Sequence, residues 1–169
     1  MKKLVLAIVG LILILAAAGL VLWLVNVNVP SSNLLKISAV LGQDQRMISQ
    51  IGPEVRTRLQ DGYQEILDSP VYFDLRAPSW FKGAWVEIVY QADRRKLVSL
   101  GGLVLEPWDY DLKQPIAVVD LDGGWQKATF YFNLKTLLNK KNIKRFLIDS
   151  SGQPGEVLKI RSINVILER

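Results

Sequence analysis

The chain has 169 residues, no cysteine, no histidine and a formal net charge of +5. These absences exclude disulfides, Cys/His zinc sites and catalysis with imidazole as the base. Lys2 and Lys3 contribute two positive charges, leaving +3 for the rest of the chain, which is too little to indicate nucleic-acid binding. We expect no nucleic-acid partner and no cofactor.

The N-terminal region contains an uninterrupted apolar run. Leu4 to Val25 is 22 residues long and has no charged, amide or hydroxyl side chain. A helix of that length spans about 33 Å, which matches the hydrocarbon core of a bilayer. Lys2 and Lys3 precede the run, and the next positive charge is Lys36. Residues 1–25 are therefore predicted to be a cytoplasmic stub and a single-pass anchor in the cell membrane, with an extracytoplasmic C-terminal domain.

A cleaved signal peptide is the alternative interpretation of the same run. Ala16, Ala17 and Ala18 resemble a small-residue cleavage site. The apolar run continues through residues 20–25, beyond the point where the apolar region of a typical signal peptide ends. We therefore favour an uncleaved signal anchor.

The polar residues 26–33 are predicted to be a short stalk, and residues 34–169 a β domain. Leu34 to Leu41 alternates apolar and polar residues, which predicts a half-buried first strand. Residues 43–62 are the hardest segment to interpret. We expect a loop and then a short strand near Glu54 to Leu59, with a helical turn as the alternative.

Further strands are expected on the basis of alternation and turn residues, at 63–67, 71–76, 84–91, 97–105, 116–121, 128–134, 143–149 and 157–167. A turn at 68–70 separates the first two, and the alternation in 71–76 predicts Val71, Phe73 and Leu75 inward and Tyr72, Asp74 and Arg76 outward. Gly101 and Gly102 suggest a bulge or sharp bend, and a change of phase near Arg161 and Ser162 predicts a β-bulge. Residues 106–115 are expected to be a loop and Lys135 to Lys141 a short helix. About eight or nine strands with almost no helix predict an all-β, antiparallel sandwich, for which a jelly roll is the best single choice.

The order of these strand segments resembles a known fold. The segments are PVYFDLRAP, AWVEIVYQ, ATFYFNL, IKRFLIDSSGQPGE and VLKIRSINVILE. They are similar to the galactose-binding-like jelly-roll sandwich that many carbohydrate-binding modules share. The resemblance concerns the order and the residue patterns of the strands over residues 34–169, and no ligand motif is matched. It implies a domain that binds a glycan or another polymer, or an accessory domain, rather than a catalytic one.

Aromatic residues in predicted loops are the best candidates for ligand binding. A saccharide presents apolar C–H faces to flat aromatic rings and hydroxyl groups to carboxylates. Trp108 and Tyr110, next to Asp109 and Asp111, fit that chemistry best. Trp125 and Trp80 are further candidates, although both could simply cover the ends of the sandwich.

Acidic residues suggest two weaker possibilities. Asp120 and Asp122 could contribute oxygen ligands to Ca²⁺, but the loop lacks the length and the distal glutamate of a calcium loop. The acidic residues could also be proposed as a glycosidase pair, which requires two carboxyl groups at a defined separation. Solvated turn residues explain them more simply, so we expect no metal ion and no enzymatic activity.

The basic residues form one cluster in the sequence. Lys140, Lys141, Lys144 and Arg145, preceded by Lys135, could contact anionic lipid headgroups or an acidic polymer. A solvated surface is the alternative.

The leading hypothesis is a membrane-anchored, non-enzymatic binding module for a glycan or another cell-envelope polymer. The alternative is a structural or assembly subunit of an envelope or surface complex. In that case Trp85, Val89 and Leu147 would form the interface with another protein.

Overall fold

The computed structural model of the chain describes residues 2–24, 33–41, 43 and 45–169, and side chains of the N-terminal helix for residues 8–21. The chain divides into two units, residues 1–32 and 33–169. The predicted stalk, apart from Asn33, lies outside the described residues.

The first unit contains helix α1 (Lys2–Leu24), which covers most of the apolar run. Within the described residues, no helix combines the length and apolarity that crossing a membrane requires. The transmembrane role of this segment stays a prediction.

The second unit consists of strands and turns. Its described residues contain eleven strands, more than the eight or nine expected, with two short 3₁₀ turns, η1 (Glu54–Arg56) and η2 (Asp122–Gly124). The strands are β1 (Leu34–Val40), β2 (Thr57–Gln60), β3 (Tyr63–Ile66), β4 (Val71–Arg76), β5 (Gly83–Ala92), β6 (Lys96–Leu105), β7 (Asp109–Lys113), β8 (Ala117–Asp120), β9 (Gln126–Asn133), β10 (Ile143–Ser151) and β11 (Leu158–Glu168). The all-β prediction is confirmed.

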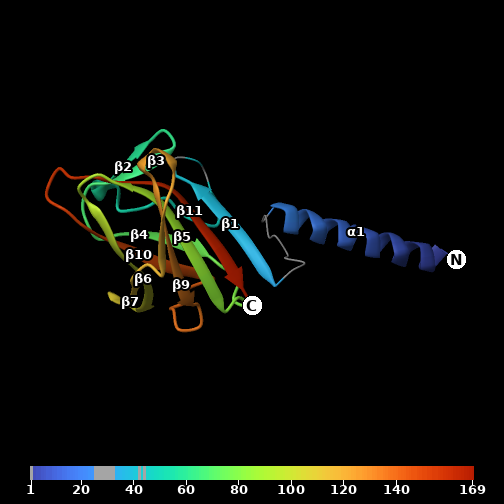
Figure 1. Cartoon of the computed structure of the whole chain (residues 1–169). Coiled ribbons are helices and arrows are strands. Elements are labelled where there is room, and N and C mark those ends of the chain that lie inside the picture. Colours follow the sequence, from blue (N-terminus) through green and yellow to red (C-terminus); the bar gives the residue numbers. More distant parts are fainter. Residues whose placement is uncertain (1, 25–32, 42, 44) are drawn as a thin grey trace. The chain divides into compact units, whose positions relative to one another are not determined.

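The strands form two antiparallel sheets (Figure 1). The large sheet has seven strands in the order β2-β3-β11-β5-β9-β8, with β1 also paired to β11. The small sheet has four strands in the order β4-β10-β6-β7. Both chain neighbours of β4 and of β10 belong to the large sheet, so the chain passes repeatedly between the layers. This arrangement confirms the antiparallel sandwich.

Alternating burial creates the core between the sheets. Val71, Phe73 and Leu75 of β4 are buried, as their spacing predicted. The ring of Phe146 from β10 stacks on Phe73 with centroids 5.3 Å apart. It also meets Phe132, from β9 of the large sheet, edge-on at 5.1 Å. These three aromatic rings therefore connect the two sheets.

The predicted bulge in β11 is confirmed. The register between β11 and β5 shifts between Ile160 and Ser162. On its other edge β11 pairs with β3 before the bulge and with β1 after it. At the bulge, the carbonyl of Arg161 accepts a hydrogen bond from the Leu41 N–H at 2.9 Å. One long strand thus holds two short strands along the same edge.

Two expectations for the small sheet are wrong. Residues 106–115, expected to be a loop, contain β7, which pairs with β6. Gly101 and Gly102 do not interrupt β6. Its register with β7 shifts after Leu103, and its register with β10 shifts opposite Asp149. The glycines are needed for close packing. A Cβ on Gly102 would lie 2.6 Å from Leu137, and one on Gly101 would lie 2.7 Å from Leu112.

The helix expected at Lys135 to Lys141 is also absent. This segment forms turns, and it ends with Lys141 and Asn142 at positive φ of 55° and 64°. The Asn133 side chain accepts the Lys135 N–H, and the Thr136 hydroxyl donates to the Asn133 carbonyl. A segment this short gains too few helical hydrogen bonds to offset nucleation, so these local bonds prevail. Farther upstream, residues 54–60 contain both alternatives considered for them, the helical turn η1 followed by strand β2.

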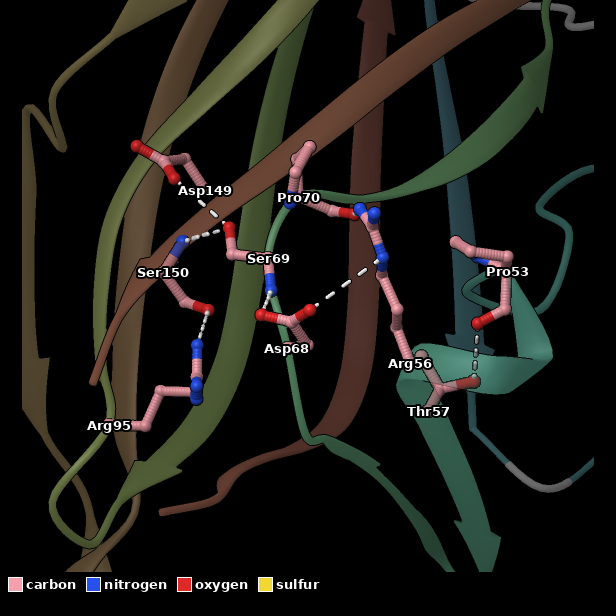
Figure 2. A network of polar contacts seen from close by, with 9 residues as sticks. All are labelled: Pro53, Arg56, Thr57, Asp68, Ser69, Pro70, Arg95, Asp149 and Ser150. Atoms are coloured by element: carbon pink, nitrogen blue, oxygen red, sulfur yellow. Dashed lines mark hydrogen bonds and ion pairs between the residues drawn. The ribbon is translucent and has the colours of Figure 1, made fainter. Parts of the chain in front are cut away.

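A polar network closes the end of the sandwich at which β10 terminates (Figure 2). The Ser69 hydroxyl donates to Asp149 and accepts the Ser150 N–H, both at 3.1 Å. Arg95 in turn donates to the Ser150 hydroxyl. Hydrogen bonds therefore hold the predicted turn at 68–70 against the end of β10, and the polar side chains at this end of the sandwich bond to one another.

Candidate functional site

The outer face of the small sheet brings together charged and aromatic side chains of the described residues that could bind a ligand. Strand alternation directs Tyr72 and Asp74 of β4 and Arg145 of β10 away from the core. The pairing of β4 with β10 sets Arg145 directly opposite Asp74. Likewise, the pairing of β6 with β7 sets Leu103 opposite Tyr110. These side chains form one continuous surface over all four strands.

A rigid ion pair lies at the centre of this surface. The Arg145 guanidinium donates from Nε to Asp74 Oδ1 at 2.8 Å and from Nη2 to Asp74 Oδ2 at 3.0 Å. Its carbon atom also lies 4.5 Å from the ring centroid of Tyr72. The hydrogen bond to Asp74 raises the pKa of Arg145 further above its usual value. A guanidinium held by a bidentate partner and an aromatic ring presents its remaining N–H groups in a fixed plane.

Tyr110 is the second ordered group. It is half-buried on the outer face, and burial is the main cause that raises its pKa. The charge of Arg145 lowers this pKa, whereas Asp74 and Tyr72 raise it. The phenol therefore keeps its proton at neutral pH and can both donate and accept a hydrogen bond.

Two adjoining hollows, which together we name the groove, open on this face. The aromatic hollow, of about 240 Å³, is lined by Tyr72, Pro107, Trp108 and Tyr110. The charged hollow, of about 140 Å³, is lined by Asp74, Leu138, Lys140 and Ile143. Leu103, Glu106 and Arg145 line both hollows. The groove therefore places aromatic rings next to fixed hydrogen-bonding groups.

The rim of the groove is exposed. Trp108 has 73% of its surface accessible to solvent. Glu106 and Lys140 form an exposed ion pair with an N–O distance of 3.3 Å. Because such a pair contributes little stability, both side chains can rearrange around a ligand at low energetic cost.

The structure separates the predicted ligand residues into two groups. Trp108 and Tyr110 both line the groove. Asp109 and Asp111 do not line it, because alternation along β7 directs them to the face opposite Tyr110. Asp111 instead pairs with Lys113 at 2.9 Å. The groove therefore brings Trp108 and Tyr110 together without these two aspartates, whose predicted role in ligand binding stays a prediction.

The other two tryptophan candidates lie outside the groove. Trp80 is 47% exposed in the loop between β4 and β5, where its ring centroid is 6.2 Å from that of buried Phe81. Trp125 precedes β9, and the Arg161 guanidinium lies 4.8 Å from its ring centroid. Neither residue lines the groove.

The predicted basic cluster does not form a common surface. Arg145 is paired with Asp74 and Lys140 with Glu106. Lys144 points inward and is only 4% exposed, so its assignment as a surface residue is wrong. Its Nζ donates to the Leu137 carbonyl at 3.5 Å, and burial lowers its pKa. Of this cluster, Lys135 and Lys141 are exposed without an ion-pair partner among the described residues.

Asp120 and Asp122, the weak calcium candidates, are not surrounded by further carboxylates among the described residues. Asp120 accepts a hydrogen bond from the Gln126 side chain at 2.9 Å, and Asp122 begins the turn η2. In the part of the chain that the structure describes, no three acidic side chains converge where they could hold a metal ion.

The three residues expected to form a protein interface do not share one surface. Trp85 and Val89 belong to the large sheet, and Val89 is only 5% exposed. Leu147 belongs to the small sheet.

Sequence reasoning missed Tyr72, Asp74 and Leu103 as groove residues. Alternation correctly directed Tyr72 and Asp74 outward, but nothing in the sequence indicates that β4 pairs with β10. Asp74 and Arg145 are 71 residues apart in the chain. A search for outward residues of opposite charge on different strands could have suggested the pair.

No protein-family model and no curated protein matches the sequence. Among solved structures, the chain resembles a xylan-binding module, CBM15, with 13% identity and a TM-score of 0.41, covering 79% of this chain and 95% of that one. It also resembles the structure described as "CBM4 structure and function", with 16% identity and a TM-score of 0.38, covering 67% and 75%. A third similar structure is the enzymatically active domain of tailspike protein 4 of bacteriophage CBA120, with 9% identity and a TM-score of 0.37, covering 79% and 19%. The resemblance is one of fold.

Proposed function

We propose that residues 33–169 bind a glycan in the groove of the small sheet, without catalysing a reaction on it, and that α1 anchors the domain at the outer surface of the cell membrane. The observation that carries the proposal is the pair of adjoining hollows. One presents the rings of Tyr72, Trp108 and Tyr110, and the other presents the paired groups of Arg145 and Asp74. A sugar ring needs both an apolar platform and fixed hydrogen-bond partners.

Ligand binding fits this groove better than hydrolysis does. A glycosidase generally needs one protonated carboxyl group and one free carboxylate on either side of the scissile bond. The two carboxylates that line the groove are Asp74 and Glu106, and each already pairs with a cation. They are therefore better suited to hold hydroxyl groups than to transfer protons.

Anchoring is supported by the sequence of the first unit. The apolar run from Leu4 to Val25 has the length of a bilayer core, and Lys2 and Lys3 precede it. This charge distribution favours a cytoplasmic N-terminus and an extracytoplasmic domain. Sedimentation of the full chain with membranes after an alkaline carbonate wash tests the anchor, and release into the supernatant would contradict it.

A glycan array with residues 33–169, followed by affinity electrophoresis on the best polysaccharide, tests glycan binding. We expect Trp108→Ala to weaken retention about tenfold, because it removes the most exposed aromatic ring of the groove, and loss of one stacking tryptophan typically costs more than about 1 kcal/mol of binding free energy. Trp80→Ala is the matched control, since it removes an exposed tryptophan outside the groove. Equal retention of both variants, with unchanged melting temperatures, would exclude the groove as the site.

A second candidate function, a structural subunit of an envelope or surface complex, is favoured by one edge of the large sheet. β8 pairs with β9 on one side only, and all four of its residues are exposed. Ile116, Val118 and Val119 present apolar side chains there. An exposed apolar edge strand can pair with a strand of another protein. Val119→Lys should then abolish cross-linking of the full chain to a partner while glycan retention is unchanged.

A further inference from the structure

One end of the sandwich, which we name the basal end, carries the connection to the first unit. It consists of Asn33, Arg169 and the segments 77–82 and 134–142. Backbone hydrogen bonds hold these parts side by side: Lys82 donates to the Glu168 carbonyl at 2.8 Å, and Leu134 donates to the Lys82 carbonyl at 2.7 Å. Ala77 donates to the Asn142 carbonyl, and Arg169 to that of Asn33. The basal end is therefore one surface, assembled from four parts of the chain.

This surface carries an excess of exposed positive charge. Lys82, Lys135, Lys141 and Arg169 are all exposed. Within the described residues none of these four cations forms an ion pair. Two carboxylates adjoin this end: Glu168 accepts a hydrogen bond from Tyr131, and Glu106 pairs with Lys140. The positive charges of the basal end are therefore available to an external anion.

Trp80 gives the same surface an amphipathic aromatic group. It lies in the 77–82 segment, two residues before Lys82, and half of its surface is exposed although Phe81 beside it is buried. Tryptophan next to lysine is typical of residues at the boundary between lipid and water, where the ring meets the headgroup region and the ammonium meets phosphate. Exposed aromatic and basic groups together thus match the chemistry of an anionic membrane surface.

The connection to α1 restricts which part of the domain can reach a membrane. Eight residues, 25–32, join Leu24 to Asn33 in the sequence. A chain of that length reaches at most about 30 Å when fully extended. Because Asn33 belongs to the basal end, this end is the part of the domain with the shortest covalent path to the proposed anchor.

We infer that the basal end docks on the anionic headgroups of the membrane in which α1 is anchored. This inference rests on the anchor of the proposed function. From the basic cluster expected from the sequence it keeps Lys135 and Lys141, and it adds Trp80, Lys82 and Arg169. Docking would hold the sandwich by the end that borders the charged hollow of the groove, because Leu138 and Lys140 of the 134–142 segment also line that hollow.

Vesicle co-sedimentation of residues 33–169 tests the inference without the anchor, since all of the buried core residues belong to this unit. We expect binding to phosphatidylcholine vesicles that contain phosphatidylglycerol, and little binding to pure phosphatidylcholine vesicles. Each basic residue close to an anionic surface contributes about fivefold in affinity, so Lys82→Gln with Lys135→Gln should weaken binding about 25-fold. Trp80→Ala should also weaken it and should remove the lipid-dependent blue shift of tryptophan fluorescence.

Arg94→Gln with Lys96→Gln is the matched control, because it removes two exposed charges, one from the turn between β5 and β6 and one from the first residue of β6, away from the basal end. This variant should bind vesicles like the unmodified domain. Equal losses for both double variants would show unspecific charge attraction and overturn the inference. Absence of vesicle binding would overturn it too, as would equally tight binding of the domain to soluble polyglutamate.

Glycan retention separates this test from that of the groove. The Lys82 and Lys135 double variant should keep its retention on the polysaccharide, and Trp108→Ala should keep its binding to vesicles. Release of the full chain in the carbonate wash would overturn the anchor and this inference together, whereas loss of vesicle binding by a chain that stays with the membrane would overturn this inference alone.

Discussion

The two faces of the small sheet are built from alternate residues of the same four strands, yet they have opposite chemistry. The inward face carries Phe73 and Phe146 in a stacked aromatic core. The outward face carries Asp74 and Arg145 as an ion pair at the centre of the groove. One step along β4 and one step along β10 are enough to change from one face to the other.

This difference shows that closeness in sequence is a poor guide to closeness in a sheet. Lys144 and Arg145 are adjacent, but the lysine is buried and the arginine lines the groove. Tyr110 and Asp111 are separated in the same way. Residues that act together on this sheet come instead from different strands at matching register positions.

Among the variants that test the difference between the two faces, the largest loss of stability is expected when one aromatic ring is removed from the inward face. Phe146→Ala should lower the free energy of unfolding by about 3–5 kcal/mol, because it leaves a cavity between Phe73 and Phe132. The adjacent outward variant, Leu147→Ala, should cost only about 1 kcal/mol because that side chain is already partly in water. Urea unfolding measures both values. Similar losses would contradict the assignment of the two residues to different faces.

Substitutions of the two glycines of β6 test the same difference between the faces, with smaller expected losses in the free energy of unfolding. Gly102→Ala should lower the free energy of unfolding by about 1–3 kcal/mol, because the new methyl group would overlap buried Leu137. Gly101→Ala should cost about 1 kcal/mol or less, because Leu112, with which it would overlap, is 55% exposed and can move into solvent, and the Tyr110 Cβ at 3.1 Å needs to shift only slightly. Thermal unfolding of both variants provides the measurement. A larger loss for the Gly101 variant would reverse the assigned faces.

The smallest expected effect concerns Lys144, the one charged side chain on the inward face of β10. Replacement by Met should raise the free energy of unfolding at neutral pH by about 1 kcal/mol, since a poorly paired polar group no longer has to be buried. Unfolding titrations of both proteins at a series of pH values give this difference. A destabilised Lys144→Met variant would show that the lysine has a stabilising partner.

The same substitution has a defined pH dependence. Burial lowers the pKa of Lys144, so between the lowered pKa and 10.5 the unfolded chain binds more protons than the folded chain. The stability of the unmodified protein therefore rises with pH across that window, while that of the variant lacks this rise. The advantage of the variant should shrink as the pH approaches 10.5. An advantage independent of pH would contradict a lowered pKa.

Much of the sandwich could be predicted because its long strands alternate strongly. Val71, Phe73 and Leu75 identified the inward face of β4, and the phase change at Ser162 identified the bulge in β11. The short elements were harder, because they depend on partners distant in the chain. β7 has five residues with two aspartates, and it is a strand only because the edge of β6 accepts it.

The groove was partly predictable for a related reason. Trp108 and Tyr110 were recognisable because exposed aromatic residues in a polar segment are typical of saccharide sites. Asp74 and Arg145 were not recognisable as a pair, since only the register between β4 and β10 brings them together. Leu103 was missed because an apolar strand residue is ordinarily assigned to the core.

The pairing of β1 with β11 determines how the domain responds to mechanical load. The chain enters the domain at Leu34, and β1 is paired residue by residue with β11 from Leu34 opposite Glu168 to Val40 opposite Ser162. A pull on the preceding chain along the strand axis loads this ladder in shear, so its hydrogen bonds must fail together rather than one after another. Under the proposed function, drag on a bound polymer would therefore reach the chain before Leu34 through this ladder, loaded in shear.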